Sequence, residues 1–373
     1  MKIGIVGGGQ LGRMLAFEAK KMGFYVAVVD PTENSPAGQI ADFQIVGNFK
    51  NGKAIRKLAK MSDVITFEIE LANDKVLKDL IKKGKKVHPS PKTLGIIRDK
   101  LKQKEFLKKS NIPTAEFIGV KSLEEIKEAG KKFGYPLLLK ARTDAYDGRG
   151  NFFVRSAEDI KMGLEKLKGR PLYVEKFVPF VKELAVMAAR SIKGEVKTYP
   201  VVETMHKNNI CHIVIVPAPI DKKTQKKAQK LAELTMQKLK GAGVFGMEMF
   251  LDKKGNVYIN EIAPRVHNSG HYTIETAATS QFEQHIRAVC GLPLGETDLK
   301  TPASVMVNIL GERNGAAQIK GLQKALALKN VTVHIYGKHE TRIERKMGHI
   351  TAFGDNMEET LKRALKARKY ISI

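Results

Sequence analysis

The chain has 373 residues and a formal net charge of +26 at pH 7, because 65 Lys and Arg oppose 39 Asp and Glu. Hydrophobic residues make up 43% and charged residues 28%, an ordinary globular composition that excludes collagen, low-complexity disorder and a pure coiled coil. The length predicts two or three domains. No apolar run approaches the roughly 18 residues that span a bilayer. The start leads directly into a strand pattern, so we expect no signal peptide and no membrane partner.

The two cysteines, Cys211 and Cys290, are too few for a disulfide scaffold or a cysteine-based zinc site. They fit a reducing cytoplasm, which is the location we predict. The positive charge raises the question of nucleic-acid binding. However, the surplus is mostly lysine spread along the whole chain, with no Trp and no arginine-rich arm. We therefore predict a solvated basic surface that attracts anionic substrates, and no nucleic-acid partner.

Strand and helix patterns alternate from the start of the chain. Lys2–Val6 reads as a buried strand, and apolar residues then follow helical spacing from Leu11 to Met22. Further strands are expected at 25–29 and 64–67, with helices at 53–61 and 74–83. This alternation predicts a parallel sheet with helices on both faces, and thus an α/β fold.

The middle of the chain predicts one helix over 93–110, which Asn111-Ile112-Pro113 ends. A compact α+β unit follows and contains a glycine-rich stretch at 142–151. Its strands are expected near 117 and at 136–140, 152–154 and 172–175, and its helices at 122–133 and 157–167.

Longer, hairpin-like strands follow. Strands 183–190 and 195–202 are joined by the turn pair Lys193-Gly194. Strands 243–251 and 257–263 flank a second turn at 252–255. The last part of the chain predicts strands at 304–308, 331–336 and 349–353 and helices at 318–328 and 357–370.

A glycine run lies between the first strand and the first helix. Gly7, Gly9 and Gly12 match the dinucleotide fingerprint, and Asp30 follows eighteen residues after Gly12. Glycines let the backbone approach a phosphate and direct helix N–H groups toward it. The pattern favours an anion or nucleotide at this turn, while NAD and a ligand-free tight turn stay open as alternatives.

Two carboxylates form the second feature. A turn at 252–255 places Glu248 and Glu261 almost opposite each other on neighbouring strands, where Cβ atoms lie about 4.5–5.5 Å apart. Carboxylates at that distance repel, so one is protonated or a cation lies between them. With Asn260 nearby, an all-oxygen site predicts Mg²⁺ that bridges a nucleotide triphosphate. The alternative is a solvent-facing charged hairpin, but the first strand is otherwise apolar.

Three further segments combine glycine with basic and polar residues. The loop 146–150 holds Arg149 between two glycines and follows Lys140. The segment 260–271 follows a buried strand and is dense in hydrogen-bonding side chains, as functional loops are. A basic cluster near the C-terminus, at 338–349, is either a solvated edge or a phosphate clamp.

Together these residues resemble the ATP-grasp superfamily, and within it the carboxylating ribonucleotide synthetases of purine biosynthesis. The resemblance covers nearly the whole chain and is most specific at 260–275 and 280–285. The opening glycine run, Glu68-Ile69-Glu70, the 146–150 loop and Arg345–His349 also match the family. The sequence departs from the family at Leu71-Ala72-Asn73 and at Arg342-Ile343-Glu344, where the family commonly has Arg-Pro-Gly.

The resemblance implies a three-domain ATP-grasp architecture with an N-terminal Rossmann-like parallel sheet. We expect an N-terminal domain at 1–92, a helical connection at 93–115, a small domain with a glycine-rich lid at 116–178, and a C domain with a small β subdomain at 179–373. A homodimer in the cytoplasm is also implied.

The implied reaction is ATP-dependent carboxylation of 5-aminoimidazole ribonucleotide by bicarbonate through carboxyphosphate, with ATP and Mg²⁺ as cofactors. Glu248 and Glu261 would hold the metal. The residues assigned to ATP by the resemblance are Arg98, Lys140, Gly148, Gly150, Glu175, Lys176, Phe177, Val178, Glu183, His206 and Asn260.

The remaining family positions are assigned to the other substrates. Those expected around bicarbonate and the reacting groups are Tyr146, Asp147, Arg149, Arg265 and His267. Those expected to bind the ribonucleotide are Gly8, Gly9, Gln10, Leu11, Glu68, Glu70, Asn268, Ser269, Lys338 and Arg345.

Three other functions remain as rivals at this stage. One is a sister ATP-grasp enzyme, either a formate-dependent glycinamide ribonucleotide transformylase or a biotin carboxylase-like subunit. The second is an oxidoreductase that uses the glycine run, and the third is a basic nucleic-acid-binding module.

Overall fold

The computed structural model describes residues 1–143 and 150–373. Its first unit is a five-stranded, all-parallel sheet of order β3-β2-β1-β4-β5. Ile3 and Ile5 pack with α1 on one face, whereas Val6 packs with α2 and α3 on the other, so the predicted two-faced sheet is confirmed. The elements are β1 (Lys2–Val6), α1 (Gln10–Lys21), β2 (Tyr25–Asp30), β3 (Phe43–Val46), α2 (Gly52–Lys60), β4 (Val64–Phe67), α3 (Asp74–Lys82) and β5 (Lys86–Val87).

The helical connection differs from the prediction. The single helix expected over 93–110 is wrong, because the chain forms α4 (Pro91–Arg98) and α5 (Lys100–Lys109) with a break at Asp99. Asp99 is extended (ψ 107°) and its carboxylate accepts hydrogen bonds from the N–H groups of Leu101 and Lys102. Aspartate is a strong N-cap, and its cap starts a new helix here.

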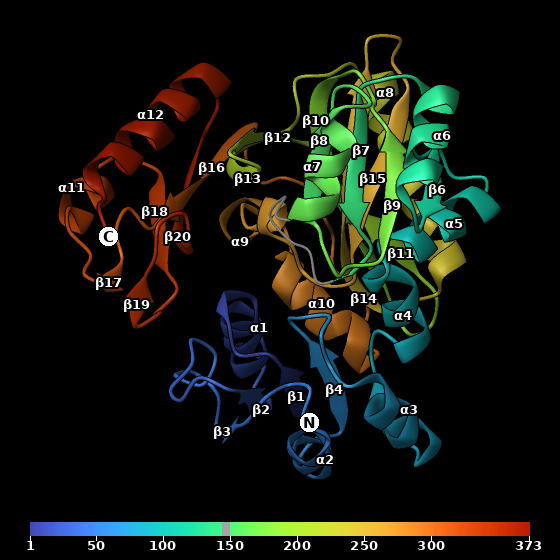
Figure 1. The fold of residues 1–373 in the computed structure, drawn as a ribbon. Helices are drawn as coiled ribbons and strands as arrows, with labels where there is room; N and C mark the ends of the chain where they lie inside the picture. Colours follow the sequence, from blue (N-terminus) through green and yellow to red (C-terminus); the bar gives the residue numbers. More distant parts are fainter. Residues whose placement is uncertain (144–149) are drawn as a thin grey trace.

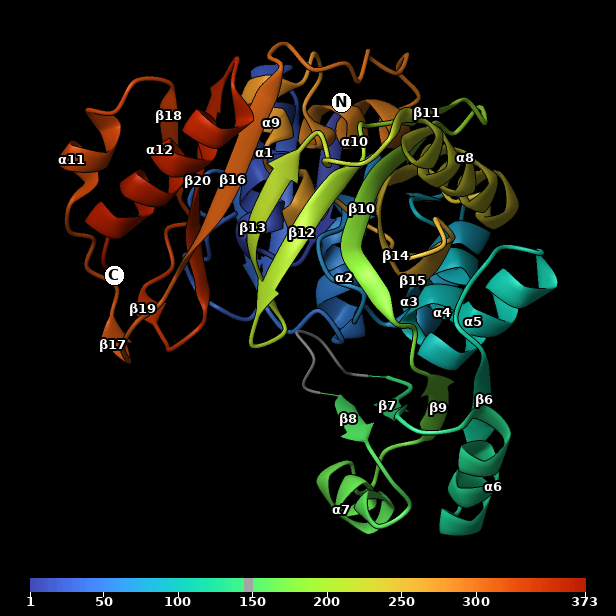
Figure 2. The ribbon, with the colours of Figure 1, turned by 90° about the horizontal axis from the view of Figure 1, so that it is seen from above.

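A small antiparallel sheet of order β6-β9-β7-β8 forms a lobe at one side of the molecule (Figure 2). Its core is separate from the others, and α6 and α7 contribute to it. The elements are β6 (Phe117–Val120), α6 (Leu123–Phe133), β7 (Leu137–Ala141), β8 (Asn151–Val154), α7 (Asp159–Lys166) and β9 (Leu172–Lys176).

The rest of the chain is built on a nine-stranded sheet whose main path runs β15-β14-β10-β12-β13-β16-β20-β18, with β11 paired to β10. The strand expected at 195–202 is wrong as one element. β11 ends at Thr198 and β12 begins at Val202, because Pro200 lies between them and cannot donate to a ladder. The strands are β10 (Phe180–Arg190), β11 (Val196–Thr198), β12 (Val202–Lys207), β13 (Ile210–Val216), β14 (Gly243–Asp252), β15 (Val257–Ala263), β16 (Ala303–Leu310), β18 (Val331–Ile335) and β20 (Lys346–Gly354).

Helix α10 (Gln281–Cys290) lies between the large sheet and the N-terminal unit (Figure 1). Within it, His285 accepts a hydrogen bond from Val244 N (3.0 Å) and contacts Thr66 Oγ1 (2.6 Å), so one buried imidazole joins both sheets. The prediction lacked α10 and α8 (Lys222–Leu239) and gave α11 too many residues. The other elements are η1 (Asn268–Gly270), α9 (Thr273–Thr276), β17 (Gly315–Ala316), α11 (Leu322–Leu326), β19 (Glu340–Thr341) and α12 (Met357–Tyr370).

Across residues 1–143 and 150–373, none of the helices combines the length and the apolar character that crossing a bilayer requires.

The break at Asp99 generates a stability prediction. Besides capping α5, the Asp99 carboxylate accepts two hydrogen bonds from the Arg142 guanidinium, at 3.1 and 2.6 Å. We expect Asp99→Ala to lower the free energy of unfolding by about 1–2 kcal/mol, since it removes a cap and a partly exposed ion pair. Asp99→Asn keeps a capping oxygen and should recover most of the loss. Urea denaturation measures both, and equal losses in the two variants would contradict the capping role.

Candidate functional site

The two acids singled out by the sequence face each other in the large sheet. Glu248 of β14 is the register partner of Glu261 of β15, which confirms the predicted pairing. The register then slips, so Asn260 is an extra residue on β15 and forms a bulge beside Glu261. Two carboxylates and an amide oxygen at one point of a hairpin are the hard oxygen donors that Mg²⁺ prefers.

A cation that the sequence reasoning missed lies against this pair. The ammonium group of Lys100, in the first turn of α5, contacts the Glu261 carboxylate. Burial lowers the pKa of Lys100 to about 8, although the charges of Glu70 and Glu248 oppose the shift. Reading Asp99 as an N-cap would have placed Lys100 at a helix start, but no local signal shows its contact with Glu261, which lies 161 residues away in sequence.

Arg98 was the cation predicted for the nucleotide in this part of the chain. The structure places its guanidinium at the end of α4, with Nη1 3.4 Å from Ala72 O. The side chain of Lys100, not that of Arg98, reaches the acid hairpin. The assignment of Arg98 to ATP stays a prediction.

The loop after β15 folds back to the acid hairpin. His267 Nε2 lies 3.4 Å from Glu248 Oε1, and its Nδ1 lies 2.8 Å from Ser269 Oγ. Burial, reinforced by the charges of Arg265 and Lys346, lowers the pKa of His267 well below its ordinary value. His267 is therefore a neutral imidazole next to one of the paired acids.

Buried Gln281 fixes the backbone at this point. Its side-chain amide donates to His267 O (2.7 Å) and its carbonyl oxygen accepts from His267 N (2.9 Å). Gln281 stands in the stretch 280–285 that carries the family resemblance, but the sequence analysis assigned it no role, because a buried glutamine on a helix has no distinctive pattern of its own. These bonds fix the main chain of His267, while Ser269 Oγ and Glu248 contact its ring.

The same loop reaches the N-terminal unit. Arg265 Nε donates to Glu70 Oε1 at 2.9 Å, so two predicted site residues from different units are in contact. Asn268 exchanges two hydrogen bonds with buried Asn308 of β16, at 2.9 and 2.7 Å. The structure thus brings the predicted bicarbonate side and the predicted ribonucleotide side together.

The C-terminal residues also approach the N-terminal unit. Gln39 Nε2 donates to Gly337 O at 2.8 Å, directly before Lys338. Lys338 Nζ donates to Lys346 O (2.6 Å), and Arg345 Nη1 donates to Glu340 O (2.6 Å). Two predicted phosphate ligands therefore lie on a segment that contacts the loop after β2.

The departure from the family pattern at Arg342-Ile343-Glu344 has a local consequence. Glu344 takes the place of the family's glycine and adopts a φ of +66°. A side chain is disfavoured in this left-handed region. The carboxylate accepts a hydrogen bond from Asn208 Nδ2 at 2.7 Å, a contact that a glycine lacks.

The glycine run is already filled by carboxylates of the chain itself. Glu68 accepts hydrogen bonds from Gly9 N (2.6 Å) and Gly12 N (2.8 Å), and Asp30 accepts one from Gly8 N (2.8 Å). Burial raises the pKa of Glu68 although both N–H donors oppose the shift. A dinucleotide pyrophosphate would need these same N–H groups, so the geometry speaks against the NAD alternative. Gln10 and Leu11 begin α1 directly beyond this turn.

The residues predicted for the nucleotide line the crossing from the small sheet to the large one. Lys140 Nζ lies 2.8 Å from Glu175 Oε1, and both side chains are largely buried. Residues 177–179 then connect β9 to β10. Lys176 pairs with Glu116 at 2.6 Å, and the Phe177 ring packs edge-on against another ring of the small lobe. Val178 O accepts a hydrogen bond from Phe180 N.

Glu183 and His206 form a close pair on neighbouring strands, with 2.5 Å between Oε2 and Nδ1. Burial alone would lower the pKa of His206, but the hydrogen bond and charge of Glu183 outweigh it and raise the pKa. Both residues were predicted on the ATP side, and the structure places them together.

Four predicted residues, Tyr146, Asp147, Gly148 and Arg149, lie outside the described residues. Gly150 is described, and its carbonyl accepts a hydrogen bond from Ala141 N at 2.8 Å.

A cluster of Glu275, His334 and His349 also has metal-ligand chemistry. However, the two imidazole rings stack at 4.5 Å with an interplanar angle of only 11°. An ion lies in the plane of each imidazole that binds it, and stacked rings cannot share one. His334 Nε2 instead pairs with Glu275 Oε1 at 2.5 Å.

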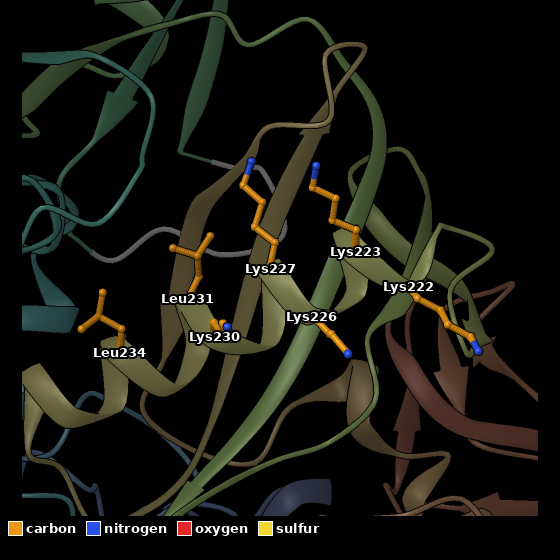
Figure 3. A pocket seen from close by; sticks show the side chains of 7 residues that line it. All are labelled: Lys222, Lys223, Lys226, Lys227, Lys230, Leu231 and Leu234. Atoms are coloured by element: carbon orange, nitrogen blue, oxygen red, sulfur yellow. The ribbon is translucent and has the colours of Figure 1, made fainter.

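A hollow of about 640 Å³ on α8 contains none of the predicted site residues (Figure 3). Its walls are five exposed lysines and two leucines, and the lysine side chains spread over the outer side of the helix. This is the solvated basic surface that the composition predicts. The residues are Lys222, Lys223, Lys226, Lys227, Lys230, Leu231 and Leu234.

Three domain families match the chain in order. Residues 1–98 match the ribonucleotide synthetase preATP-grasp domain, and 105–282 match the ATP-grasp domain. Residues 304–363 match the phosphoribosylaminoimidazole carboxylase C-terminal domain. Fungal and plant relatives named phosphoribosylaminoimidazole carboxylase are 43–47% identical, and the chain spans 64–68% of their length.

A relative from Bacillus subtilis named N5-carboxyaminoimidazole ribonucleotide synthase is 43% identical, covering 94% of this chain and 90% of that one. The crystal structure of N5-carboxyaminoimidazole ribonucleotide synthetase from Thermotoga maritima has a TM-score of 0.91 and 50% identity, covering 100% and 98% of the two chains. The crystal structure of N5-carboxyaminoimidazole synthase from Aspergillus clavatus, in complex with ADP and 5-aminoimidazole ribonucleotide, has a TM-score of 0.91 and 41% identity. The match covers 99% of this chain and 98% of that one.

The Glu183–His206 pair generates a pH prediction. Because pairing raises the pKa of His206, its stabilisation is complete below the unfolded pKa of about 6.5 and is lost as pH rises through the folded value. The loss of unfolding free energy in His206→Gln should therefore be largest in acid and shrink above neutral pH. Urea titrations from pH 5.5 to 8.5 measure it.

His212 provides the matched control, since burial lowers its pKa. His212→Gln should show the opposite trend and gain relative stability as pH falls. A pH-independent effect of His206→Gln would contradict the ion pair.

Proposed function

The chain belongs to the N5-carboxyaminoimidazole ribonucleotide synthase family of ATP-grasp proteins, and we propose that it uses ATP to join bicarbonate to 5-aminoimidazole ribonucleotide. The observation that carries this proposal is the path of one strand and its loop. β15 supplies Glu261, and six residues later His267 returns to within 3.4 Å of Glu248. This path supports the proposal that the site for a metal-bound triphosphate and the site for a small anion share one wall.

The first step activates bicarbonate, which is a poor electrophile. One of its oxygens attacks the γ-phosphorus of ATP, the bond to the β,γ-bridging oxygen breaks, and ADP leaves. The product is carboxyphosphate, an activated carboxyl donor. Positioning and charge neutralisation dominate such phosphoryl transfers. Lys100, which contacts Glu261, and Lys140, whose charge acts on Lys100, would neutralise phosphate charge.

We propose Mg²⁺ as the metal of this site, held by Glu248 and Glu261 with the amide oxygen of Asn260 close by. The donor set fits, because it is all oxygen and carries two negative charges at register-paired positions. The contact between Lys100 and Glu261 supports the fit, since it shows a cation drawn to this carboxylate. A bound Mg²⁺ would neutralise the phosphate charge.

The second step joins the carboxyl group to the amine. The exocyclic amine of the ribonucleotide attacks the carboxyphosphate carbon, phosphate leaves, and the nitrogen loses a proton. Arg265 and neutral His267 lie beside the hairpin and would orient the carboxylate, as preorganised donors do. Lys338 and Arg345 would bind the 5′-phosphate. Glu68, Glu70, Asn268 and Ser269 would face the rest of the ribonucleotide.

The adenine end would lie at the crossing between the sheets. We propose that the main chain of Glu175–Val178 reads the base, because this segment is the edge where β9 ends and the chain passes to β10. Glu183, on β10, would bind the ribose hydroxyls beside His206. A homodimer in the cytoplasm is also part of the proposal, and light scattering in solution tests the dimer.

Omission of each substrate in turn tests the proposed reaction. Phosphate release from Mg·ATP should require both bicarbonate and 5-aminoimidazole ribonucleotide for full rate, because the anion and the amine react in one site. A coupled ADP assay with each substrate omitted in turn measures this. Formate with glycinamide ribonucleotide provides the control. Turnover with formate and glycinamide ribonucleotide, and none with bicarbonate and 5-aminoimidazole ribonucleotide, would contradict this proposal and indicate a transformylase instead.

Substitution of Arg265 tests its assignment to the bicarbonate side of the site. Arg265→Ala removes the guanidinium that contacts Glu70 next to the hairpin. Loss of such a donor costs about 10²–10³ in kcat, so carboxylation should fall by this factor while Mg·ATP binding survives. Arg170→Ala, at an exposed position on the small lobe, is the charge-matched control. Full coupled turnover in Arg265→Ala would refute the assignment.

A further inference from the structure

Three charged side chains form a buried row beside the nucleotide edge. Glu175 of β9 has Lys140 on one oxygen and Lys104 on the other, each nitrogen 2.8 Å away. The exposed fractions of the side chains are 11% for Lys140, 1% for Glu175 and 2% for Lys104. Only the Lys140 end of the row therefore approaches the surface, and Lys104 is its innermost member.

The row has an excess of positive charge. Burial alone would raise the pKa of Glu175, but the charges of Lys104 and Lys140 lower it to about 2, so this carboxylate is ionised at neutral pH. This one carboxylate lies between two lysine amino groups, and burial lowers the pKa of Lys104 although the charge of Glu175 opposes that shift. Burying a charge without full compensation is costly. The presence of a second lysine beside one carboxylate therefore needs a functional reason.

The row interacts electrostatically with the lysine that contacts the acid hairpin. The charge of Lys140 contributes to the lowered pKa of Lys100, whose ammonium contacts Glu261, so the two lysines are within electrostatic reach of each other. A triphosphate bound along this edge would meet Lys140 first. Glu175 competes with any phosphate for that ammonium, because a carboxylate and a phosphate attract the same charge.

Lys104 also ties the row to the metal hairpin. Its Nζ donates to Thr114 Oγ1 (2.9 Å), and that hydroxyl donates to Ile259 O of β15 (2.8 Å). Ile259 directly precedes Asn260 at the bulge. The lysine thus spans from β9 of the small lobe to the strand that carries Glu261.

We propose that Lys104 is a positioning residue of the nucleotide site, which occupies the inner oxygen of Glu175 and so leaves the Lys140 ammonium available to a phosphate group of ATP. The inference deepens the proposed function, since it concerns how that site binds ATP. It requires no contact between Lys104 and the nucleotide. It assigns a role to a buried lysine that the two chemical steps do not use.

The test compares Mg·ATP binding by isothermal titration calorimetry in the full-length chain and its variants. In Lys104→Met, the charge of Glu175 is left to Lys140 alone. Affinity should fall about tenfold, which corresponds to about 1.4 kcal/mol. Lys102→Met changes the same net charge at an exposed position of the same helix and should bind Mg·ATP as the parent chain does.

A double variant separates electrostatics from packing. Lys104→Met with Glu175→Gln removes both inner charges, and replacing both partners of a buried pair is often tolerated. Lys140 then has no competing carboxylate, so most of the lost affinity should return. Steady-state kinetics should show the same defect in Lys104→Met as a raised KM for ATP with kcat largely retained.

Two results would overturn the inference. One is parent-like affinity in a folded Lys104→Met variant. The other is a double variant that binds as weakly as the single one, since that outcome assigns Lys104 to packing alone. If Lys104→Met does not fold, the double variant is compared with the parent chain: near-parent Mg·ATP affinity supports the inference, and affinity about tenfold below the parent overturns it. Because the titration uses only Mg·ATP, its outcome is independent of whether the chain carboxylates the ribonucleotide.

Discussion

The repulsion between two paired carboxylates is the constraint around which this site is built. Glu248 and Glu261 are register partners in the hairpin, so the strand pairing holds their backbones side by side and brings two acidic side chains to one place. Like charges at this spacing require a compensating cation. The structure supplies Lys100 to one acid and places the His267 ring next to the other. A divalent ion with a bound triphosphate meets the same requirement.

The assembly of this site depends on buried contacts between units that are distant in sequence. His285 joins β4 to β14, and α10 carries it between the two sheets. Burial lowers the pKa of His285 to about 3, so the imidazole is neutral. With Nδ1 accepting from Val244 N, its Nε2 is left as a donor to Thr66 Oγ1. A neutral link is suited to a dry interface, because it avoids the cost of burying a charge.

The sequence predicted those parts that depend on local pattern. The parallel sheet and the β14–β15 hairpin follow from hydrophobic periodicity and turn residues, and the Glu248–Glu261 pairing follows from the turn alone. It could not show that Glu68 fills the glycine run, because that contact joins residues 59 apart in sequence. The Asp99 break was readable as a cap but was hidden by the helical periodicity on either side. The domain boundaries and the roles of the site residues stay predictions.

The Glu68 contact also explains why a glycine run with the spacing of a dinucleotide-binding turn does not bind a dinucleotide phosphate here. A glycine run at a helix start exposes N–H groups that favour any anion. In this chain a carboxylate of the protein itself, and not a ligand, accepts these hydrogen bonds. Glu68 satisfies Gly9 and Gly12 from within the fold, and the cost is a partly buried carboxylate whose pKa is raised by desolvation. The turn thereby becomes a support for an acidic side chain near Arg265, whose charge acts on Glu68. A phosphate would be repelled there, whereas the hydroxyl and amine groups of a ribonucleotide could donate to the carboxylate.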